Sequence, residues 1–129
     1  MRTGMTQRKL ANAAWRILDN AEPESVAELT VSEIARRLNV SRPNLSRAFR
    51  SPCYFTLRNF IEIKKVVMFE FLLFYQQTRT VKETLEVLDI RDSSHFIKKF
   101  KAWHPQTPGQ RCREIKKLLK SWGFYRPKK

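Results

Sequence analysis

The sequence is poor in cysteine and lacks a long apolar run, and each shortage excludes a class of protein. Its two cysteines, Cys53 and Cys112, are too few for a disulfide scaffold and do not form a CxxC pair, so we expect free thiols in a reducing compartment. The densest apolar run, Val66–Tyr75, contains Glu70 and is too short to span a bilayer. The N-terminal residues lack the apolar segment of a signal peptide. We therefore expect a cytoplasmic protein with no membrane partner.

No group of side chains has the spacing of a catalytic or metal-binding site. The two histidines, His95 and His104, and the two cysteines lack the paired spacing of a structural zinc site. Isolated serine, histidine and aspartate residues are ordinarily helix caps or surface residues. We therefore expect no metal, no cofactor and no enzymatic activity.

Acidic residues are also scarce. There are 12 of them against 26 lysines and arginines, which gives a net charge of +14. Such a charge points to a polyanionic partner, nucleic acid first and an anionic membrane surface second. One acidic stretch surrounds Pro23, and we expect it to face away from a polyanion. Its members are Asp19, Glu22, Glu24 and Glu28. With 129 residues, the chain fits one compact domain or two very small ones that share a core.

A helix-turn-helix pattern begins at Thr30. Thr30 and Glu33 have the Thr-x-x-Glu spacing of a capping box, which starts a short helix. Asn39 tolerates the left-handed backbone of a tight turn, and Ser41 can cap the helix that follows. The apolar residues of that next helix are four apart, at Leu45 and Phe49. Helix, short turn and helix form the helix-turn-helix motif.

The same pattern returns fifty residues later. Thr80 and Glu83 repeat the capping box, and Leu88–Ile90 stand where Leu38–Val40 stood. The next apolar pair, Phe96 and Phe100, matches Leu45 and Phe49 at an offset of fifty-one residues, so the second turn is one residue longer. We therefore predict two copies of one module.

Between the copies, Leu57–Tyr75 has helical character and no breaker. A helix of this length spans about 28 Å, near the ~34 Å between successive major grooves of B-DNA. Its core-facing stripe is Ile61, Val66, Phe69, Leu72 and Leu73. A second stripe lies on nearly the opposite side, at Phe60, Ile63, Val67, Phe71 and Phe74. Either the C-terminal helix covers part of this second stripe, or Phe71 and Phe74 contact a second copy or another protein.

These patterns predict an all-α fold with two helix-turn-helix subdomains joined by a long linker helix, about seven helices plus a C-terminal helical extension. We expect an N-terminal helix over Thr6–Asn20 capped by Thr6, and a C-terminal helix over Gln110–Ser121 stopped by Gly123, before a frayed basic tail at 126–129. The predicted divisions are 1–56, 57–76, 77–113 and 114–129.

This arrangement resembles the DNA-binding domain of AraC-type (AraC/XylS) transcription regulators. The first motif is TVSEIARRLNVSRPNLSRAFR, and the second is DIRDSSHFIKKFKAW followed by Thr107-Pro108. The resemblance covers about Gln7 to Arg113. It implies a seven-helix domain in which the second helix of each module enters the major groove of DNA. The chain departs from the family pattern at Asn39 and Asp89, which replace turn glycines, and at Leu85.

The resemblance also places the contacts. Base-reading positions fall on Arg42, Pro43, Asn44, Ser46 and Arg47 in the first module, and on Ser93, Ser94, His95 and Lys98 in the second. Phosphate contacts are expected from Thr30, Ser41, Arg50, Thr80, Lys99 and Lys101. Arginine can donate two hydrogen bonds to guanine, which makes Arg47 the main candidate for base recognition. Asp89 and Asp92 bring negative charge near the second site.

We therefore expect a sequence-specific, double-stranded DNA-binding transcription regulator of bacterial origin, with RNA polymerase as a possible partner. One alternative is a non-specific nucleic-acid-binding or architectural protein. The other is a protein-interaction module, for example an anti-regulator, that uses the second stripe of the linker helix.

Overall fold

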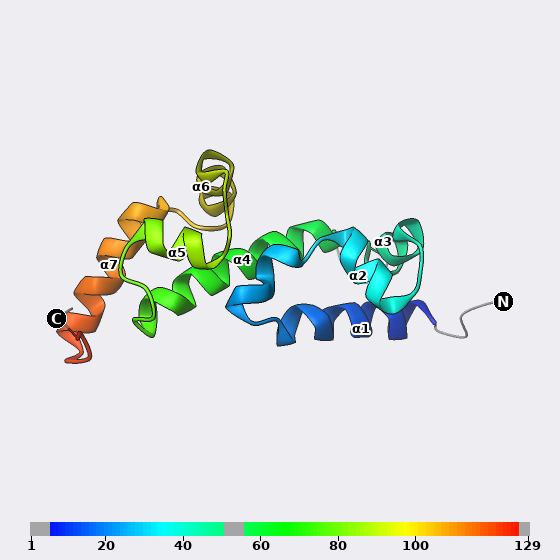
Figure 1. Cartoon of the computed structure of the whole chain (residues 1–129), viewed down its shortest axis with the longest axis horizontal. Coiled ribbons are helices and arrows are strands. Elements are labelled where there is room, and N and C mark those ends of the chain that lie inside the picture. The colour runs from blue at the N-terminus through cyan, green and yellow to red at the C-terminus, as the bar shows by residue number, and fades with distance from the viewer. Residues whose placement is uncertain (1–5, 51–55, 127–129) are drawn as a thin grey trace. The chain divides into compact units, whose positions relative to one another are not determined.

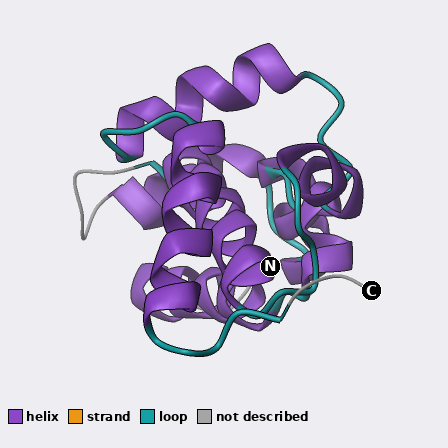
Figure 2. Cartoon of the chain, turned by 90° about the vertical axis from the view of Figure 1, so that its left-hand side faces the viewer, coloured by secondary structure: helices purple, strands orange, loops and turns teal. Residues whose placement is uncertain are grey.

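Figure 1 shows the chain as a computed structural model, which describes residues 6–50 and 56–126. Over these two ranges the chain forms seven α-helices and one 3₁₀ helix. Figure 2 shows only helices and loops, and no strand, in the described residues. The predicted all-α fold is therefore confirmed. The 3₁₀ helix is an additional element that was not predicted.

The elements are α1 (Gln7–Asn20), η1 (Pro23–Glu28), α2 (Val31–Leu38), α3 (Arg42–Arg50), α4 (Leu57–Phe74), α5 (Val81–Val87), α6 (Ser93–Trp103) and α7 (Pro108–Ser121). Two residues of the acidic stretch, Glu24 and Glu28, lie in η1, where Pro23 takes the first position because its missing N–H has no partner there in any case. The linker helix α4 ends one residue earlier than predicted, and α7 begins two residues earlier.

The chain divides into two compact units, Met1–Lys64 and Lys65–Lys129, and the boundary lies inside α4. Each unit contains one of the two predicted helix-turn-helix modules. Within the residues that the structure describes, no helix combines the length and the apolar character needed to cross a membrane.

The first unit packs α1 against α2 and α3. The buried side chains of α1 are Leu10, Ala14 and Leu18, which share one face because they are four residues apart. The Thr6 hydroxyl caps the helix, as predicted, by accepting the backbone N–H of Lys9 at 3.2 Å. The same core includes Leu29, Ile34, Ala35, Leu45, Ala48, Phe49, Leu57 and Ile61.

In the second unit, three phenylalanine rings hold α6 against the second half of α4. The ring centroid of Phe69 lies 5.4 Å from those of Phe96 and Phe100, which are 5.8 Å from each other. Aromatic pairs of this kind contribute about 0.5–1.5 kcal/mol beyond their buried area. The buried side chains of α7 on this unit are Pro108, Cys112, Ile115 and Leu119.

Both helix-turn-helix turns contain a residue with positive φ. The φ angle is 57° at Asn39 and 54° at Asp89. Asparagine and aspartate adopt this left-handed conformation more readily than other residues with a Cβ. They can therefore stand where the AraC-type pattern, which the sequence resembles, has glycine. In each turn the next residue donates its N–H to a carbonyl five residues back, which closes the helix. The second connection, residues 88–92, is two residues longer than the first, residues 39–41, and not one residue longer as predicted, because α5 ends one position earlier in its module than α2 does.

The predicted capping boxes of α2 and α5 are only half formed. The hydroxyls of Thr30 and Thr80 accept the backbone N–H groups of Glu33 and Glu83, at 3.0 Å in each case. The glutamate side chains turn elsewhere, to arginines on α2 itself and to the backbone N–H of Arg79 before α5. The threonine half of each box is therefore confirmed, and the glutamate half is wrong in both. The carboxylates bind nearby cations in α2 and a different backbone donor before α5.

A complete capping box, which was not predicted, begins α7. The Thr107 hydroxyl accepts the backbone N–H of Gln110 at 3.1 Å, and the Gln110 side chain accepts the backbone N–H of Thr107 at 2.9 Å. The Thr-x-x-Gln spacing, with proline at the first helical position, was the available signal. Gly123 has a φ of 79° and follows the last residues of α7, as predicted.

The core-facing stripe of α4 is buried as predicted, at Ile61, Val66, Phe69, Leu72 and Leu73. The exposure of the second stripe differs between the two ends of the helix. Within the first unit, Phe60 packs against aromatic rings of α1 and α3. Within the second unit, Phe74 lies against Trp122 and below an arginine of α7, while Val67 and Phe71 are exposed. The C-terminal helix therefore covers the stripe at Phe74 and leaves Val67 and Phe71 exposed.

The C-terminal segment is ordered further than predicted. The backbone N–H of Arg126 donates to Gln76 Oε1 at 2.8 Å, and Gln76 Nε2 donates to the carbonyl of Phe124 at 2.8 Å. The prediction of a frayed tail is therefore wrong at Arg126, because Gln76 holds its backbone. Residues 127–129 of that tail, and the Cys53 thiol, lie outside the described residues. Cys112 is a buried free cysteine.

Candidate nucleic-acid interface

The helix α3 carries the predicted base-reading residues of the first module. Ser41 caps it as predicted, because its Oγ accepts the backbone N–H of Asn44 at 3.2 Å. Leu45 and Phe49 are buried and fix the helix on the core. The other predicted contacts are exposed, at Arg42, Pro43, Asn44, Arg47 and Arg50, while Ser46 is half-buried. The geometry of α3 therefore brings these residues to one accessible surface.

On this surface, Asn44 holds Arg47 in a defined orientation. Arg47 Nη1 donates to Asn44 Oδ1 at 3.1 Å, between side chains one turn apart. A guanidinium group has five N–H donors, so most of them stay available after this hydrogen bond. A side chain that is already ordered loses less entropy when it binds a ligand, so this hydrogen bond lowers the entropic cost of a contact between Arg47 and a ligand.

The helix caps retain donors that suit phosphate. Thr30 and Thr80 are both exposed, and each uses its hydroxyl oxygen as an acceptor in the cap. A hydroxyl that accepts through its oxygen can still donate its proton. The caps therefore leave one O–H each for a phosphate oxygen.

A carboxylate neutralises part of the basic surface next to α3. Glu33 accepts from Arg36 Nε at 2.9 Å and from Arg37 Nε at 2.8 Å. The hydrogen bond from Arg36, followed by that from Arg37, lowers the pKa of Glu33 from 4.5 to about 2. Arg37 also lies 3.7 Å from a carboxylate oxygen of Glu28. These arginines of α2 are thus engaged with acids, and α3 supplies the cations of the candidate interface.

The helix α6 carries the corresponding residues of the second module. Asp92 caps it, because Asp92 Oδ1 accepts the backbone N–H of His95 at 3.0 Å. Phe96 and Phe100 are buried. The exposed predicted contacts are Ser93, Ser94, His95, Lys98 and Lys101, while Lys99 is half-buried. The second set of predicted residues is therefore also gathered on one helix.

The two helices match position by position from their first residues. In both, buried apolar side chains stand at the fourth and eighth positions, and an exposed cation stands at the sixth, Arg47 in α3 and Lys98 in α6. The modules differ in charge near the helix N-terminus. Asp92 caps α6, and Asp89 lies 3.6 Å from Arg91, whereas the first turn has the neutral Asn39. Because acids repel phosphate, the first module is the better suited to DNA.

An ion cluster in the second unit was not predicted. Arg111 Nε donates to Glu70 Oε2 at 2.5 Å, and His104 Nε2 lies 3.4 Å from the same oxygen. The His104 ring also stacks on Phe100, with centroids 5.1 Å apart. The cluster links α4 to α7 and to the turn before it. In the described part of the chain, no group of three or more histidine, cysteine, aspartate or glutamate residues is arranged to hold a metal ion.

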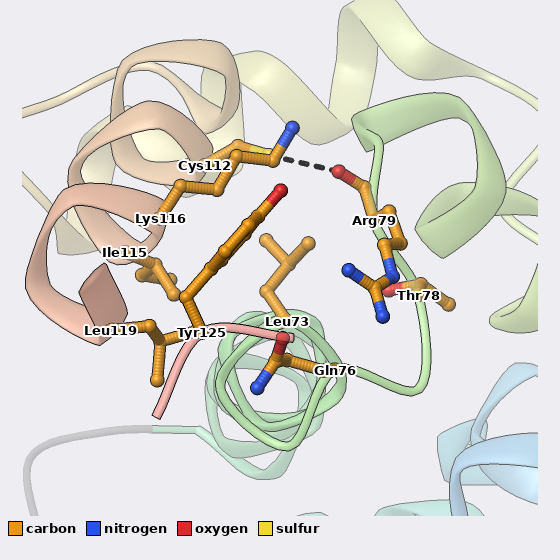
Figure 3. A pocket seen from close by; sticks show the side chains of 9 residues that line it. All are labelled: Leu73, Gln76, Thr78, Arg79, Cys112, Ile115, Lys116, Leu119 and Tyr125. Atoms are coloured by element: carbon orange, nitrogen blue, oxygen red, sulfur yellow. Dashed lines mark hydrogen bonds between the residues drawn. The ribbon is translucent and has the colours of Figure 1, made fainter. Parts of the chain in front are cut away.

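A small cavity in the second unit lies between α4, α7 and the C-terminal segment. Figure 3 shows Leu73, Cys112, Ile115 and Tyr125 around it. Its volume of about 10 Å³ is at the lower limit for one water molecule. Burial raises the pKa of the Cys112 thiol, whose sulfur lies 3.7 Å from the carbonyl oxygen of Arg79. The cavity has no room for a ligand.

Exposed apolar side chains gather on the second unit. We call them the apolar patch, and its members are Val67, Phe71, Tyr75, Trp122 and Phe124. They line a groove together with Phe74 and Leu119, and the rings of Phe71 and Tyr75 are 4.6 Å apart. Contiguous exposed apolar surface is typical of protein-protein contacts.

Comparison with known proteins gives no match: no family model, no curated protein and no solved structure matches this chain.

Proposed function

We propose that the chain is a sequence-specific, double-stranded DNA-binding transcription regulator that acts in the bacterial cytoplasm. The observation that carries the proposal is the position-by-position match of α3 and α6. Each presents exposed polar and basic side chains from a helix whose opposite face is buried. The net charge of +14 supports a polyanionic partner. The residue motifs resembling AraC-type regulators add the expectation that both helices enter major grooves.

In this mechanism, base edges are read by exposed side chains of the two helices. Arg47 donates to O6 and N7 of guanine, and Lys98 takes the same position in the second module. Phosphates are bound by Arg50, Lys101 and the capping hydroxyls, which fix the register of the protein on the duplex. Binding near a promoter then recruits or blocks RNA polymerase.

The experiment that tests the proposal is selection of binding sites from random duplex DNA at about 150 mM salt, followed by footprinting. We expect two enriched blocks about one helical turn of DNA apart, one for each module. Arg47→Ala removes the enrichment in one block and Lys98→Ala that in the other. A pool that shows no enriched sequence after selection would contradict the proposal.

Two alternative outcomes identify the rival functions. A non-specific or architectural nucleic-acid-binding protein binds the unselected pool as tightly as any enriched duplex, with a similar salt slope. A protein-interaction module binds duplex weakly and uses the apolar patch instead. The exposure of Phe71 and Tyr75 favours this second candidate over the first. Sedimentation of the free protein, at several concentrations, tests its simplest form, which is self-association.

A further inference from the structure

Ile97 is an exposed isoleucine on the recognition helix of the second module. It has 39% of its surface exposed and lies in α6. A single exposed apolar residue is common in proteins and needs no explanation by itself. What distinguishes Ile97 is its place. Helical spacing puts it one turn from Ser93, Ser94 and Lys101, all of which are exposed. It therefore belongs to the surface that the proposed function assigns to DNA.

The equivalent residue in the first module supports this placement. Ile97 is the fifth residue of α6, and Ser46, one of the predicted base-reading residues, is the fifth residue of α3. The next residues are Lys98 and Arg47, the exposed cations of the two helices. The two modules thus present different chemistry at the same position, a hydroxyl in one and a branched alkyl group in the other.

We propose that Ile97 determines specificity by contacting the 5-methyl group of a thymine in the major groove. This inference rests on the proposed function. Among the four bases only thymine presents an apolar group in that groove, and the other base edges there present hydrogen-bond donors and acceptors. An isoleucine placed against a polar edge would displace water without replacing its hydrogen bonds. Against a methyl group, both partners lose apolar surface to water.

The side chain of isoleucine suits this role. Its β-branched carbon restricts the first side-chain torsion, so little rotamer freedom is lost when it is held against a base. Serine at the same position favours no methyl group and can donate or accept with several bases. We therefore expect the first and second modules to differ in base preference at this position, with thymine in the block read by α6.

The test uses the full chain and a duplex obtained by site selection. Each thymine in the block bound by α6 is replaced in turn by deoxyuridine, which lacks only the methyl group. For the unmodified protein, one such replacement should weaken binding about fourfold, the effect of one buried methyl group. With Ile97→Ser, the same replacement should have no effect. The matched control is Val87→Ser, which changes a side chain of 38% exposure on α5 and should retain the fourfold effect.

The outcomes separate this inference from the function on which it rests. In one outcome, selection enriches sites while deoxyuridine leaves the affinity unchanged at every position of the block bound by α6. That result would overturn the methyl contact and leave the proposed regulator function standing. Sensitivity to deoxyuridine that persists in Ile97→Ser would assign the contact to another residue and overturn it as well. Failure to select any site would contradict both proposals together.

Discussion

Asn44 accepts a hydrogen bond from Arg47 across one turn of α3, with 3.1 Å between Oδ1 and Nη1. Both side chains were predicted separately as base readers. The structure makes them a pair, in which the amide oxygen orients the guanidinium group while the remaining donors stay accessible. Under the proposed function the pair contacts DNA as one unit, so its two members should not contribute independently.

The first prediction follows from that coupling. Arg47→Ala should weaken binding to the selected duplex by about 1–3 kcal/mol, because a bidentate contact with guanine is lost. Asn44→Ala should cost less, and the double variant should cost less than the sum of the two, because both remove the same contact. Fluorescence anisotropy titrations measure all three. Arg16→Ala, an exposed arginine on α1, is the matched control. Strict additivity of the two single effects would contradict the coupling.

Sequence reasoning succeeded where the signal is local. The caps at Thr6, Thr30 and Ser41 depend on residues three positions apart. The positive φ at Asn39 follows from the type of residue in a short turn. The buried side of α3 and that of α6 follow from four-residue spacing. These features need no knowledge of the rest of the chain.

Sequence reasoning failed where partners are distant. Arg111 and Glu70 are 41 positions apart, and Gln76 holds the C-terminal segment 50 positions later. No local pattern distinguishes such a contact from two surface side chains. For the second stripe of α4 the sequence left two alternatives open, because the covering of Phe74 depends on where Trp122 lies. The structure bears out the alternative in which the C-terminal helix covers part of the stripe. The function of the exposed side chains likewise depends on the molecule that binds them, and the sequence of one chain does not specify that molecule.

The second prediction concerns Asp89, which has a positive φ of 54°. Asp89→Ala should destabilise the chain by about 1 kcal/mol, because alanine adopts this conformation less readily than aspartate. Asp89→Gly should be neutral or stabilising by up to about 1 kcal/mol, since glycine has no Cβ to clash. The Arg91 ion pair lost in both variants is exposed and contributes little. Urea unfolding followed by circular dichroism gives the comparison, and equal stability of the two variants would count against backbone strain.

The third prediction separates two residues of the second α4 stripe. Phe74→Ser should destabilise the chain by about 1–3 kcal/mol, because its ring packs against Trp122 and Arg111. Phe71→Ser should cost less than about 1 kcal/mol, since Phe71 is exposed. If the apolar patch joins two copies, Phe71→Ser should also lower the sedimentation coefficient at high concentration. A monomer both before and after the substitution would rule out self-association through the patch.

The fourth prediction concerns acid. The folded-state pKa of Glu33 is about 2, well below its ordinary value of 4.5, chiefly because of the hydrogen bonds from Arg36 and Arg37. The stabilisation by these contacts is therefore complete above pH 4.5 and is lost as the pH falls toward 2. Between those values the wild type should lose stability more steeply than Glu33→Gln, which has no carboxylate to protonate there. Parallel stability curves for the two proteins would show that the arginine contacts do not contribute.

The last prediction concerns two buried threonines. The hydroxyls of Thr78 and Thr84 lie 2.6 Å apart, and Thr84 Oγ1 also lies 2.7 Å from the carbonyl oxygen of Thr80. Thr84 has one hydroxyl proton, and the carbonyl can only accept it, so Thr78 must donate to Thr84. Both threonine side chains are buried, so a hydroxyl that loses its partner there cannot turn to water.

Thr84→Val should therefore destabilise the chain by about 1–3 kcal/mol, because it leaves the Thr78 hydroxyl buried without its acceptor. Adding Thr78→Val should recover part of that loss, since replacing both partners by apolar groups of the same shape removes the unsatisfied donor. Urea unfolding of the two single variants and the double variant closes a thermodynamic cycle. A double variant as unstable as the sum of the single ones would mean that the two hydroxyls do not interact, and the direction of donation inferred above would lose its basis.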